Sequence, residues 1–352
     1  MWEGRYHTPH ILIYIDLEHG RFEVIGLHII MDGAAYFEFV RRWVAFAQDP
    51  DLGTSGFPPV KWSRQWLHDQ QFPKPGRPPH EGVGTQEAGP VAKLCFRLFY
   101  NFFALVEKYC YKGLMPFLLK LMIPPTVMLE VKMSEISGVP PEDQDVERLS
   151  MNDVATARIW RAFLHARLAT KQIKPVGQSK CGFPVNMRRL LSCPADAITN
   201  CYLLACASGP IEEIVKESEA KSAARVRRAT NQLRDPGTVK DFVGWYLSVK
   251  LRSLTTIIMK TIRGENCLVN NWVCFKPSQI AGKGFTPARF RILGQRGWTP
   301  AGAHDGCSIL TDSCDHDDEL VAFVGAEAGE CAQAVRKYLE ANSCQVKELE
   351  LS

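Results

Sequence analysis

The N-terminal part of the chain alternates short apolar runs with polar turns. A β-branched run predicts a strand over 11–15, and a second strand over 22–27 follows a His-Gly turn, so the two are expected to pair as a hairpin. From 34 to 48 the apolar residues recur at helical spacing in two stripes, which predicts a helix that is buried between layers. The predicted local order is therefore strand, polar turn and buried helix.

The pattern breaks over 49–90, where prolines and glycines are dense. Such a composition is typical of an irregular connection, and this stretch is the best candidate for a crossover between domains. An aromatic-rich region with helical character follows over 94–121, and a short strand is predicted over 127–133.

The rest of the chain mixes helices and strands without internal repeats, which predicts an α/β or α+β protein. The clearest helix covers 150–169, with Ser150 or Asn152 as its N-cap and Asp153 in its first turn. Two further helices are predicted over 212–233 and 329–342. Strands are predicted over 184–188, 202–207, 267–275, 286–293, 307–311 and 319–325.

The charges change this picture little, because 42 basic and 38 acidic residues leave a net charge of only +4. The basic residues are dispersed, which argues against a nucleic-acid groove. The one basic run, in the predicted helix 212–233, is interpreted as a solvated face; it comprises Lys221, Arg225, Arg227 and Arg228. No apolar run is long enough for a transmembrane helix, although 94–121 is a candidate for peripheral contact with a membrane surface.

Twelve cysteines lie mostly inside apolar runs, and no signal peptide is recognised at the start of the sequence. Reduced, buried thiols in a cytoplasmic protein are therefore expected. The nearest approach to a metal pattern fits no zinc spacing, so neither a metal nor a bound cofactor is expected; that set is His304, Cys307, Cys314 and His316.

The residues with candidate chemistry are His28, at the end of the second predicted strand, and Asp32, which a glycine follows. An imidazole at a strand end can point into a cleft and take a proton from an attacking hydroxyl or amine near neutral pH. Asp32 is better placed to hold the loop than to contact a substrate. On spacing alone, a hydrogen-bonded histidine without a catalytic role stays the main alternative.

The stretch from 12 to 48 resembles the HxxxDG strand, turn and helix of the BAHD acyltransferases and their relatives, chloramphenicol acetyltransferase and the condensation domains. Weaker similarities follow in the same order as in that family. They lie at 150–162, 185–200, 270–272, 282–287, 305–310 and 319–325. No later segment is specific alone, but the ordered set extends the resemblance over nearly the whole chain.

The resemblance implies a two-lobed, chloramphenicol-acetyltransferase-like α/β sandwich. The expected parts are an N-terminal lobe over 1–72, a crossover over 73–90 and a C-terminal lobe over 91–352. It also implies a monomer of secondary metabolism that moves an acyl group from acyl-CoA, its cosubstrate, to a small-molecule alcohol or amine.

The resemblance assigns roles to individual residues as well. His28 is the expected general base, and Asp32 is the expected structural partner of Arg188. The amide of Asn270 and the indole of Trp272 are the candidate donors to the oxyanion. Two alternatives stay open: Trp272 as plain core packing and Arg188 as a surface charge.

Two departures from the family pattern matter. The family's DFGWG segment corresponds here to Gly-Lys-Gly-Phe-Thr over 282–286, without the aspartate. Only residues 1–27 precede the HxxxDG motif, so an N-terminally truncated protein with an incomplete first lobe is expected. The alternative function is a catalytically inactive remnant of the same fold that acts as a binding or interaction protein.

Overall fold

The computed structural model describes eight stretches of the chain, apart from residues 135, 137, 144 and 147. These stretches are 11–16, 21–26, 33–49, 125–193, 201–248, 264–276, 305–313 and 319–349. The chain divides into two compact units. The first comprises 1–71, 186–203 and 275–289, and the second comprises 72–185, 204–274 and 290–352. The predicted boundaries near 72 and 90 lie outside the described residues and stay predictions.

The first unit contains the predicted hairpin and buried helix. Strands β1 (Ile11–Asp16) and β2 (Arg21–Gly26) pair antiparallel, so the prediction of a hairpin is confirmed. Helix α1 (Gly33–Gln48) follows, and its Phe37 is buried with its ring 5.5 Å from that of Phe275. One predicted stripe, with Phe37, Val40 and Val44, is buried, whereas the other is only half-buried and its Phe46 is 46% exposed. The helix is confirmed, but the prediction that it is buried on two faces is wrong.

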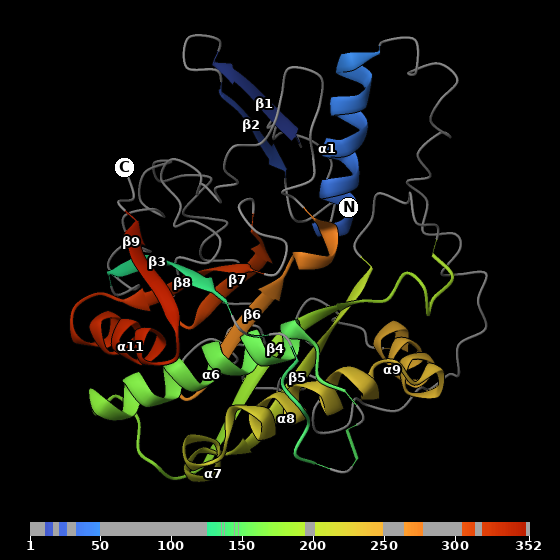
Figure 1. The fold of residues 1–352 in the computed structure, drawn as a ribbon. Helices are drawn as coiled ribbons and strands as arrows, with labels where there is room; N and C mark the ends of the chain where they lie inside the picture. Colours follow the sequence, from blue (N-terminus) through green and yellow to red (C-terminus); the bar gives the residue numbers. More distant parts are fainter. Residues whose placement is uncertain are drawn as a thin grey trace, which may run out of the picture. The chain divides into compact units, whose positions relative to one another are not determined.

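The second unit is built on a seven-stranded mixed sheet in the order β5-β4-β6-β7-β8-β3-β9 (Figure 1). Strands β4, β6 and β7 run parallel, whereas β7–β8, β8–β3 and β3–β9 are antiparallel pairs. The bounds of the strands are β3 Thr126–Met133, β4 Gln178–Asn186, β5 Tyr202–Pro210, β6 Cys267–Asn271, β7 Cys307–Asp312, β8 Leu320–Glu327 and β9 Cys344–Leu349. The α/β class predicted from the sequence is confirmed.

Helix α6 (Met151–Ala169) is the central helix of this unit, and the predicted N-cap is Ser150. The Ser150 hydroxyl accepts the Asp153 N–H at 3.3 Å, and the Asp153 carboxylate accepts the Ser150 N–H at 2.7 Å, which completes a capping box. Most of α6 is buried, including Trp160 with no exposed surface. A helix buried on nearly all sides must lie between other layers.

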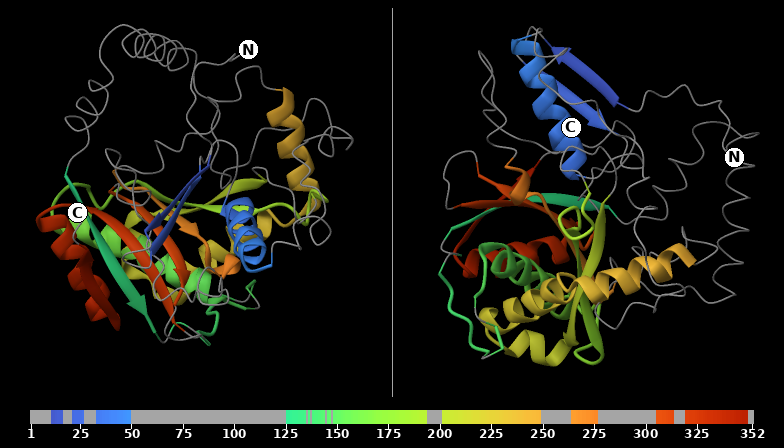
Figure 2. Two further views of the ribbon diagram at one scale, coloured as in Figure 1. Left: turned by 90° about the horizontal axis from the view of Figure 1, so that it is seen from above. Right: turned by 90° about the vertical axis from the view of Figure 1, so that its right-hand side faces the viewer.

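The neighbours of α6 are the sheet and the helices that lie beside it. Helices α6, α8 (Glu219–Gln232) and α11 (Glu330–Ala341) lie along one face of the sheet, with α8 and α11 flanking α6 (Figures 1 and 2). The short α7 (Ile211–Lys216) precedes α8, and α9 (Pro236–Ser248) follows it. None of the described helices has the length and apolar character needed to cross a membrane.

Several elements differ from the sequence prediction. The single helix predicted over 212–233 is two helices, because Ser218 caps a new helix with its hydroxyl on the Lys221 N–H. The strand predicted over 267–275 ends at Asn271 and continues as a 3-10 turn, η2 (Val273–Phe275). Strand β4 begins six residues earlier than predicted, at Gln178 instead of Pro184. Helix α9 and strand β9 were not predicted from the sequence, and the elements predicted over 94–121 and 286–293 lie outside the described residues.

Candidate active site

The candidate oxyanion donors lie at the C-terminal end of β6. Asn270 is in register with Ile309 of β7, and the Trp272 N–H donates to the Leu310 carbonyl at 2.7 Å. The side chain of Asn271 accepts the Val273 N–H at 3.0 Å and so starts the turn η2. The backbone that carries Asn270 and Trp272 is therefore fixed on one side by β7 and at its end by a side-chain cap.

The alternation of buried and half-buried side chains along β6 shows on which face of the sheet Asn270 lies. Cys267 and Val269 are fully buried, whereas Leu268 and Asn270 are half-buried. Side chains of a strand alternate between the two faces of its sheet. Asn270 therefore lies on the face opposite to Cys267 and Val269. Trp272 is half-buried as well, so it is not a fully enclosed core residue.

Arg188 lies in the turn directly after β4 and is buried, with 7% of its surface exposed. The alternative that it is a surface charge is wrong. Its backbone N–H donates to the Asn186 side-chain oxygen at 3.0 Å, and its carbonyl accepts the Cys193 N–H at 2.8 Å. A buried guanidinium requires a charged or strongly polar partner, as expected for a structural ion pair.

The proposed base and the expected partner of Arg188, His28 and Asp32, both lie outside the described residues. Their contact with Arg188 and their position relative to Asn270 stay predictions. Of the residues considered for a metal, only Cys307 is described. Within the described stretches, no group of His, Cys, Asp and Glu side chains has the arrangement of a metal site.

A buried ion pair that was not predicted from the sequence lies at the opposite, N-terminal end of β6. Arg167 of α6 is 1% exposed and donates to the carbonyls of Gly264 and Asn266 at 2.6 and 2.8 Å. Its other amino group is 2.7 Å from the carboxylate of Asp305, which in turn accepts the Glu327 N–H at 3.2 Å. One guanidinium thus joins the segments that lead into β6 and β7. The available signal in the sequence was Arg167, an arginine one turn after Phe163 on a largely apolar helix.

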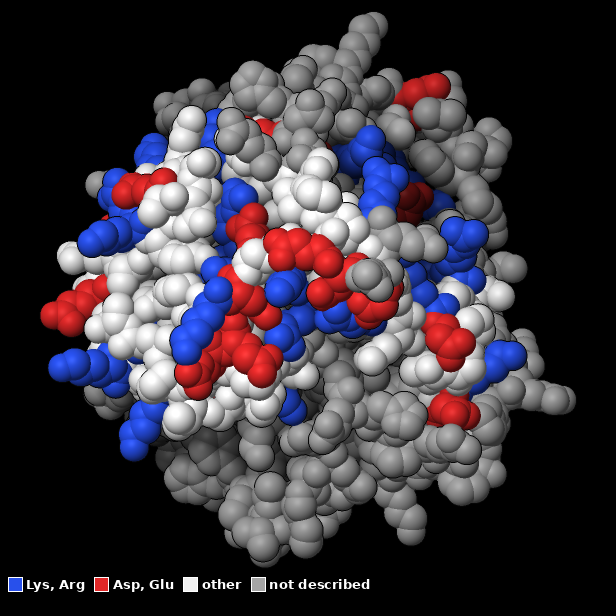
Figure 3. Space-filling view, turned by 60° about the horizontal axis from the view of Figure 1, so that its bottom comes forward, with Lys and Arg blue, Asp and Glu red and all other residues white. Residues whose placement is uncertain are grey.

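A hollow of about 720 Å³ lies over α7 and α8, and none of the candidate catalytic residues lines it. Acidic and basic side chains are interleaved on this face (Figure 3). The lining consists of Asp143, Pro210, Glu212, Glu213, Lys216, Glu217, Lys221, Arg225 and Arg228.

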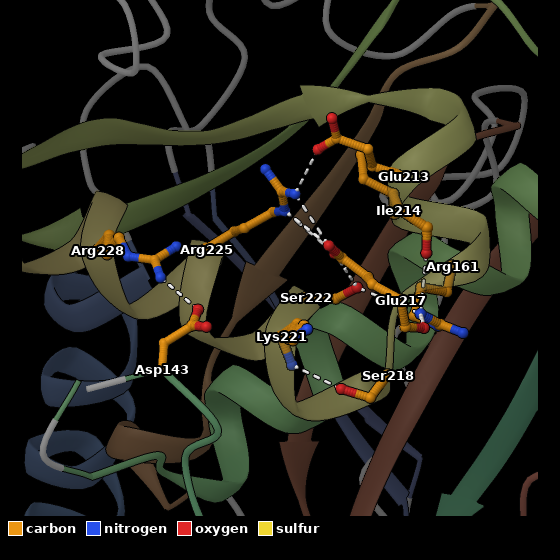
Figure 4. Close-up of polar contacts among 10 residues, drawn as sticks. All are labelled: Asp143, Arg161, Glu213, Ile214, Glu217, Ser218, Lys221, Ser222, Arg225 and Arg228. Atoms are coloured by element: carbon orange, nitrogen blue, oxygen red, sulfur yellow. Dashed lines mark hydrogen bonds and ion pairs between the residues drawn. The ribbon is translucent and has the colours of Figure 1, made fainter. Parts of the chain in front are cut away.

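The charges of this hollow are largely paired with one another. Arg225 reaches between Glu213 and Glu217 at 3.0 and 2.9 Å (Figure 4). Arg228 pairs with Asp143 and Asp145, and the carboxylate of Asp153 pairs with Arg227. The basic run interpreted as a solvated face is instead largely an ion-paired face. Balanced, mutually satisfied charges do not favour a binding site for a particular ligand.

Comparison with known proteins gives a fold and no closer relative. No family model and no curated protein sequence matches the chain. Among solved structures, TRI101 of F. sporotrichioides in complex with coenzyme A and T-2 aligns with a TM-score of 0.64 at 13% identity, over 97% of this chain and 70% of that one. TRI101 of F. graminearum with coenzyme A and deoxynivalenol gives 0.63 at 13% identity, over 96% and 70%. Vinorine synthase gives 0.52 at 14% identity, over 88% and 60%.

The chain has a chloramphenicol-acetyltransferase-like fold. The fold class predicted from the ordered motifs is thereby confirmed, with the seven-stranded sheet of the second unit as its described part. At this level of identity the likeness concerns the fold.

Proposed function

We propose that this protein transfers an acyl group from acyl-CoA to the hydroxyl or amine of a small molecule. The observation that carries the proposal is a fold match over 97% of the chain to a protein solved with coenzyme A and a small-molecule ligand. The HxxxDG sequence at 28–33 and the position of Asn270 and Trp272 at one strand end support the same reaction class.

The proposed reaction proceeds in a ternary complex. His28 removes the proton from the acceptor hydroxyl or amine, and the resulting nucleophile attacks the thioester carbonyl carbon. The carbonyl oxygen becomes an oxyanion, which the Asn270 amide and the Trp272 indole N–H stabilise by hydrogen bonds. The intermediate collapses by breaking the carbon–sulfur bond, and the coenzyme A sulfur takes the proton that His28 holds.

Arg188 has a positioning role in this proposal. Its burial requires compensation of its charge, and Asp32 is the proposed partner. Since Asp32 is four residues after His28, an ion pair with Arg188 would fix the loop that carries the imidazole. Neither residue needs to contact the substrate for this effect.

The test is release of coenzyme A from acetyl-CoA and longer acyl-CoA thioesters by the purified full chain, followed by chromatography and mass spectrometry of the acylated acceptor. The acceptor panel should contain alcohols and amines, including T-2 and deoxynivalenol, the molecules bound in the similar structures. His28→Ala is expected to lower turnover by about 10²–10⁴-fold, the usual contribution of a positioned base. Asn270→Ala is expected to lower kcat by about 10²–10³-fold, as for removal of one oxyanion donor.

The matched control is His80→Ala, in the proline- and glycine-rich stretch, which should retain full turnover. Equal turnover by His28→Ala and by the unchanged protein would remove the proposed base. Binding of coenzyme A without turnover on any acceptor would favour the inactive, ligand-binding alternative. The monomeric state, the cytoplasmic location, a role in secondary metabolism and a membrane contact through 94–121 stay predictions.

A further inference from the structure

Two buried cysteines face each other across the shortest described ladder of the sheet. Strands β4 and β6 share only two registered pairs, Cys181 with Cys267 and Gly182 with Leu268. Both cysteines are fully buried, with no exposed surface. We call the junction of β4 and β6 at these two pairs the seam.

The register puts the two cysteines within range of a covalent bond. Registered residues in neighbouring strands lie about 4.8 Å apart across the ladder. A disulfide joins residues whose Cα atoms are roughly 4.4–6.8 Å apart. The expected Cα separation of Cys181 and Cys267 is therefore within the range of a disulfide, and their side chains must rotate to form one. Direct neighbours on parallel strands do not have the preferred Cβ separation of a disulfide, so the bond would be strained and easily reduced.

The seam is also a place where the sheet can open. Pro184 of β4 has no N–H, so the ladder cannot continue past Gly182 with its full set of hydrogen bonds. The chain leaves the second unit shortly after both strands, at Asn186 and at Phe275. In the closed seam, burial raises the pKa of the Cys181 thiol, so that little of the reactive thiolate is present. Reaction therefore depends on transient separation of β4 from β6.

We propose that Cys181 and Cys267 form a reversible disulfide that joins β4 to β6 when a peroxide oxidises the protein. One thiolate attacks the peroxide oxygen and becomes a sulfenic acid, and the peroxide leaves as water. The second thiol attacks the sulfenic sulfur, and a second water molecule is released as the sulfur–sulfur bond forms. A dithiol reductant reverses the step by exchange. The bond restrains β6, the strand that carries Asn270.

The experiment uses the folded full chain and hydrogen peroxide, with free thiols then blocked by N-ethylmaleimide. Trypsin digestion without reduction places Cys181 in peptide 181–188 and Cys267 in peptide 264–283. The expected product is these two peptides joined, with the mass of two hydrogen atoms lost, and it should disappear after treatment with dithiothreitol. Since peptide 264–283 also contains the exposed Cys274, the experiment is repeated in Cys274→Ser.

The joined peptides should persist in Cys274→Ser and vanish in Cys181→Ser and in Cys267→Ser. Cys331→Ser, a buried thiol on α11, is the matched control and should leave their yield unchanged. The mass of the joined peptides in the unchanged protein tests the proposal even where a variant does not fold. Peroxide that oxidises Cys274 completely and yields no 181–188 to 264–283 linkage would overturn it, as would a linkage that Cys274→Ser abolishes.

Discussion

The two sides of the large sheet are held together in different ways. On one side, β3 and β8 pair along eight consecutive residues, from Thr126–Glu327 to Met133–Leu320. On the other side, β4 and β6 pair at only two positions. The first junction is stabilised by its own backbone hydrogen bonds and by burial of apolar side chains on both faces of β3 and β8. The second needs additional support, and α6 supplies much of it.

That support consists of side-chain hydrogen bonds at the start of β6. The Trp160 indole donates to the Ser179 hydroxyl at 2.7 Å, and this hydroxyl donates to the Glu265 carbonyl. The side-chain oxygen of Asn266 accepts the Lys180 N–H at 2.8 Å, in place of a backbone carbonyl. Arg167 binds two carbonyls of the same segment. A junction built from side chains is more sensitive to single substitutions than a ladder is, and this difference can be tested.

The largest expected effect comes from Arg167→Met. The substitution keeps the apolar stem but leaves Asp305 and two carbonyls without their buried cation. Breaking a buried ion pair from one side costs roughly 3–5 kcal/mol, so the free energy of unfolding should fall by about that amount. Urea denaturation followed by circular dichroism measures it.

The matched control is Arg336→Met, which removes an exposed ion pair with Glu340 on α11. Solvent screens an exposed pair of this kind, so the midpoint of this variant in urea should hardly change. Equal midpoints for the two variants would contradict a supporting role for Arg167.

A smaller effect is expected from Ser179→Ala at the seam. The hydroxyl accepts from Trp160 and donates to Glu265, so its removal leaves the buried Trp160 indole N–H without its acceptor and the part-buried Glu265 carbonyl without its donor. Leaving such groups unpaired costs about 1–3 kcal/mol of unfolding free energy. The comparison is Ser308→Ala on β7, where the hydroxyl is 1% exposed and has no hydrogen-bond partner.

Ser308→Ala removes a polar group that is buried without compensation, so it should be neutral or stabilising. The two variants delete the same atom from equally buried strand positions of one sheet. A greater loss of stability in Ser308→Ala than in Ser179→Ala would show that side-chain hydrogen bonds do not support the seam.

The smallest effect concerns a different surface of α6, where His165 stacks on Tyr338 of α11 with ring centroids 4.6 Å apart. Burial lowers the pKa of His165, the neighbouring charge of Arg161 lowers it further, and a hydrogen bond to the backbone of Val215 opposes the shift. The unfolded chain therefore binds a proton more readily than the folded chain does. The contribution of His165 to stability is complete above a pH of about 6.5, the pKa of histidine in the unfolded chain. It is lost as the pH falls from there toward the lower pKa of the folded chain.

His165→Phe keeps a ring against Tyr338 but cannot be protonated. Between about pH 7.5 and about pH 5.5, the urea midpoint of the unchanged protein should fall more than that of the variant. His165 packs toward α11 and α7, whereas Ser179 lies at the seam. The loss of stability caused by Ser179→Ala should therefore be the same at both pH values. Identical pH profiles for the unchanged protein and His165→Phe would rule out this contribution.

Much of the architecture could be predicted from local patterns. The hairpin of β1 and β2, helix α1 and the Ser150 N-cap of α6 follow from alternation, helical spacing and capping residues. The ordered motifs predicted the fold class. The position of Asn270 and Trp272 after a strand was predicted as well, although the strand is shorter than expected.

Other features were not predicted, because their sequence signals are short or weak or depend on distant residues. Helix α9 begins at Pro236 and has Val239, Phe242 and Val243 at helical spacing, all buried, but it is short and contains two glycines. Strand β9 is an edge strand in which Gln345, Lys347 and Glu348 are polar, so its apolar signal is weak. The basic run of α8 resembled a solvated surface, since its carboxylate partners come from distant positions such as Asp143 and Asp153.

The sequence by itself determined the elements, their order and the residue types available for acyl transfer, because spacing and capping act over a few residues. Only the tertiary structure decided which distant residues meet. Arg167 and Asp305 are 138 positions apart, and no local pattern could pair them. The register of Cys181 with Cys267 was likewise set by the sheet. Registers of parallel strands depend on the burial of both faces and on long connections, so they are a property of the whole folded unit.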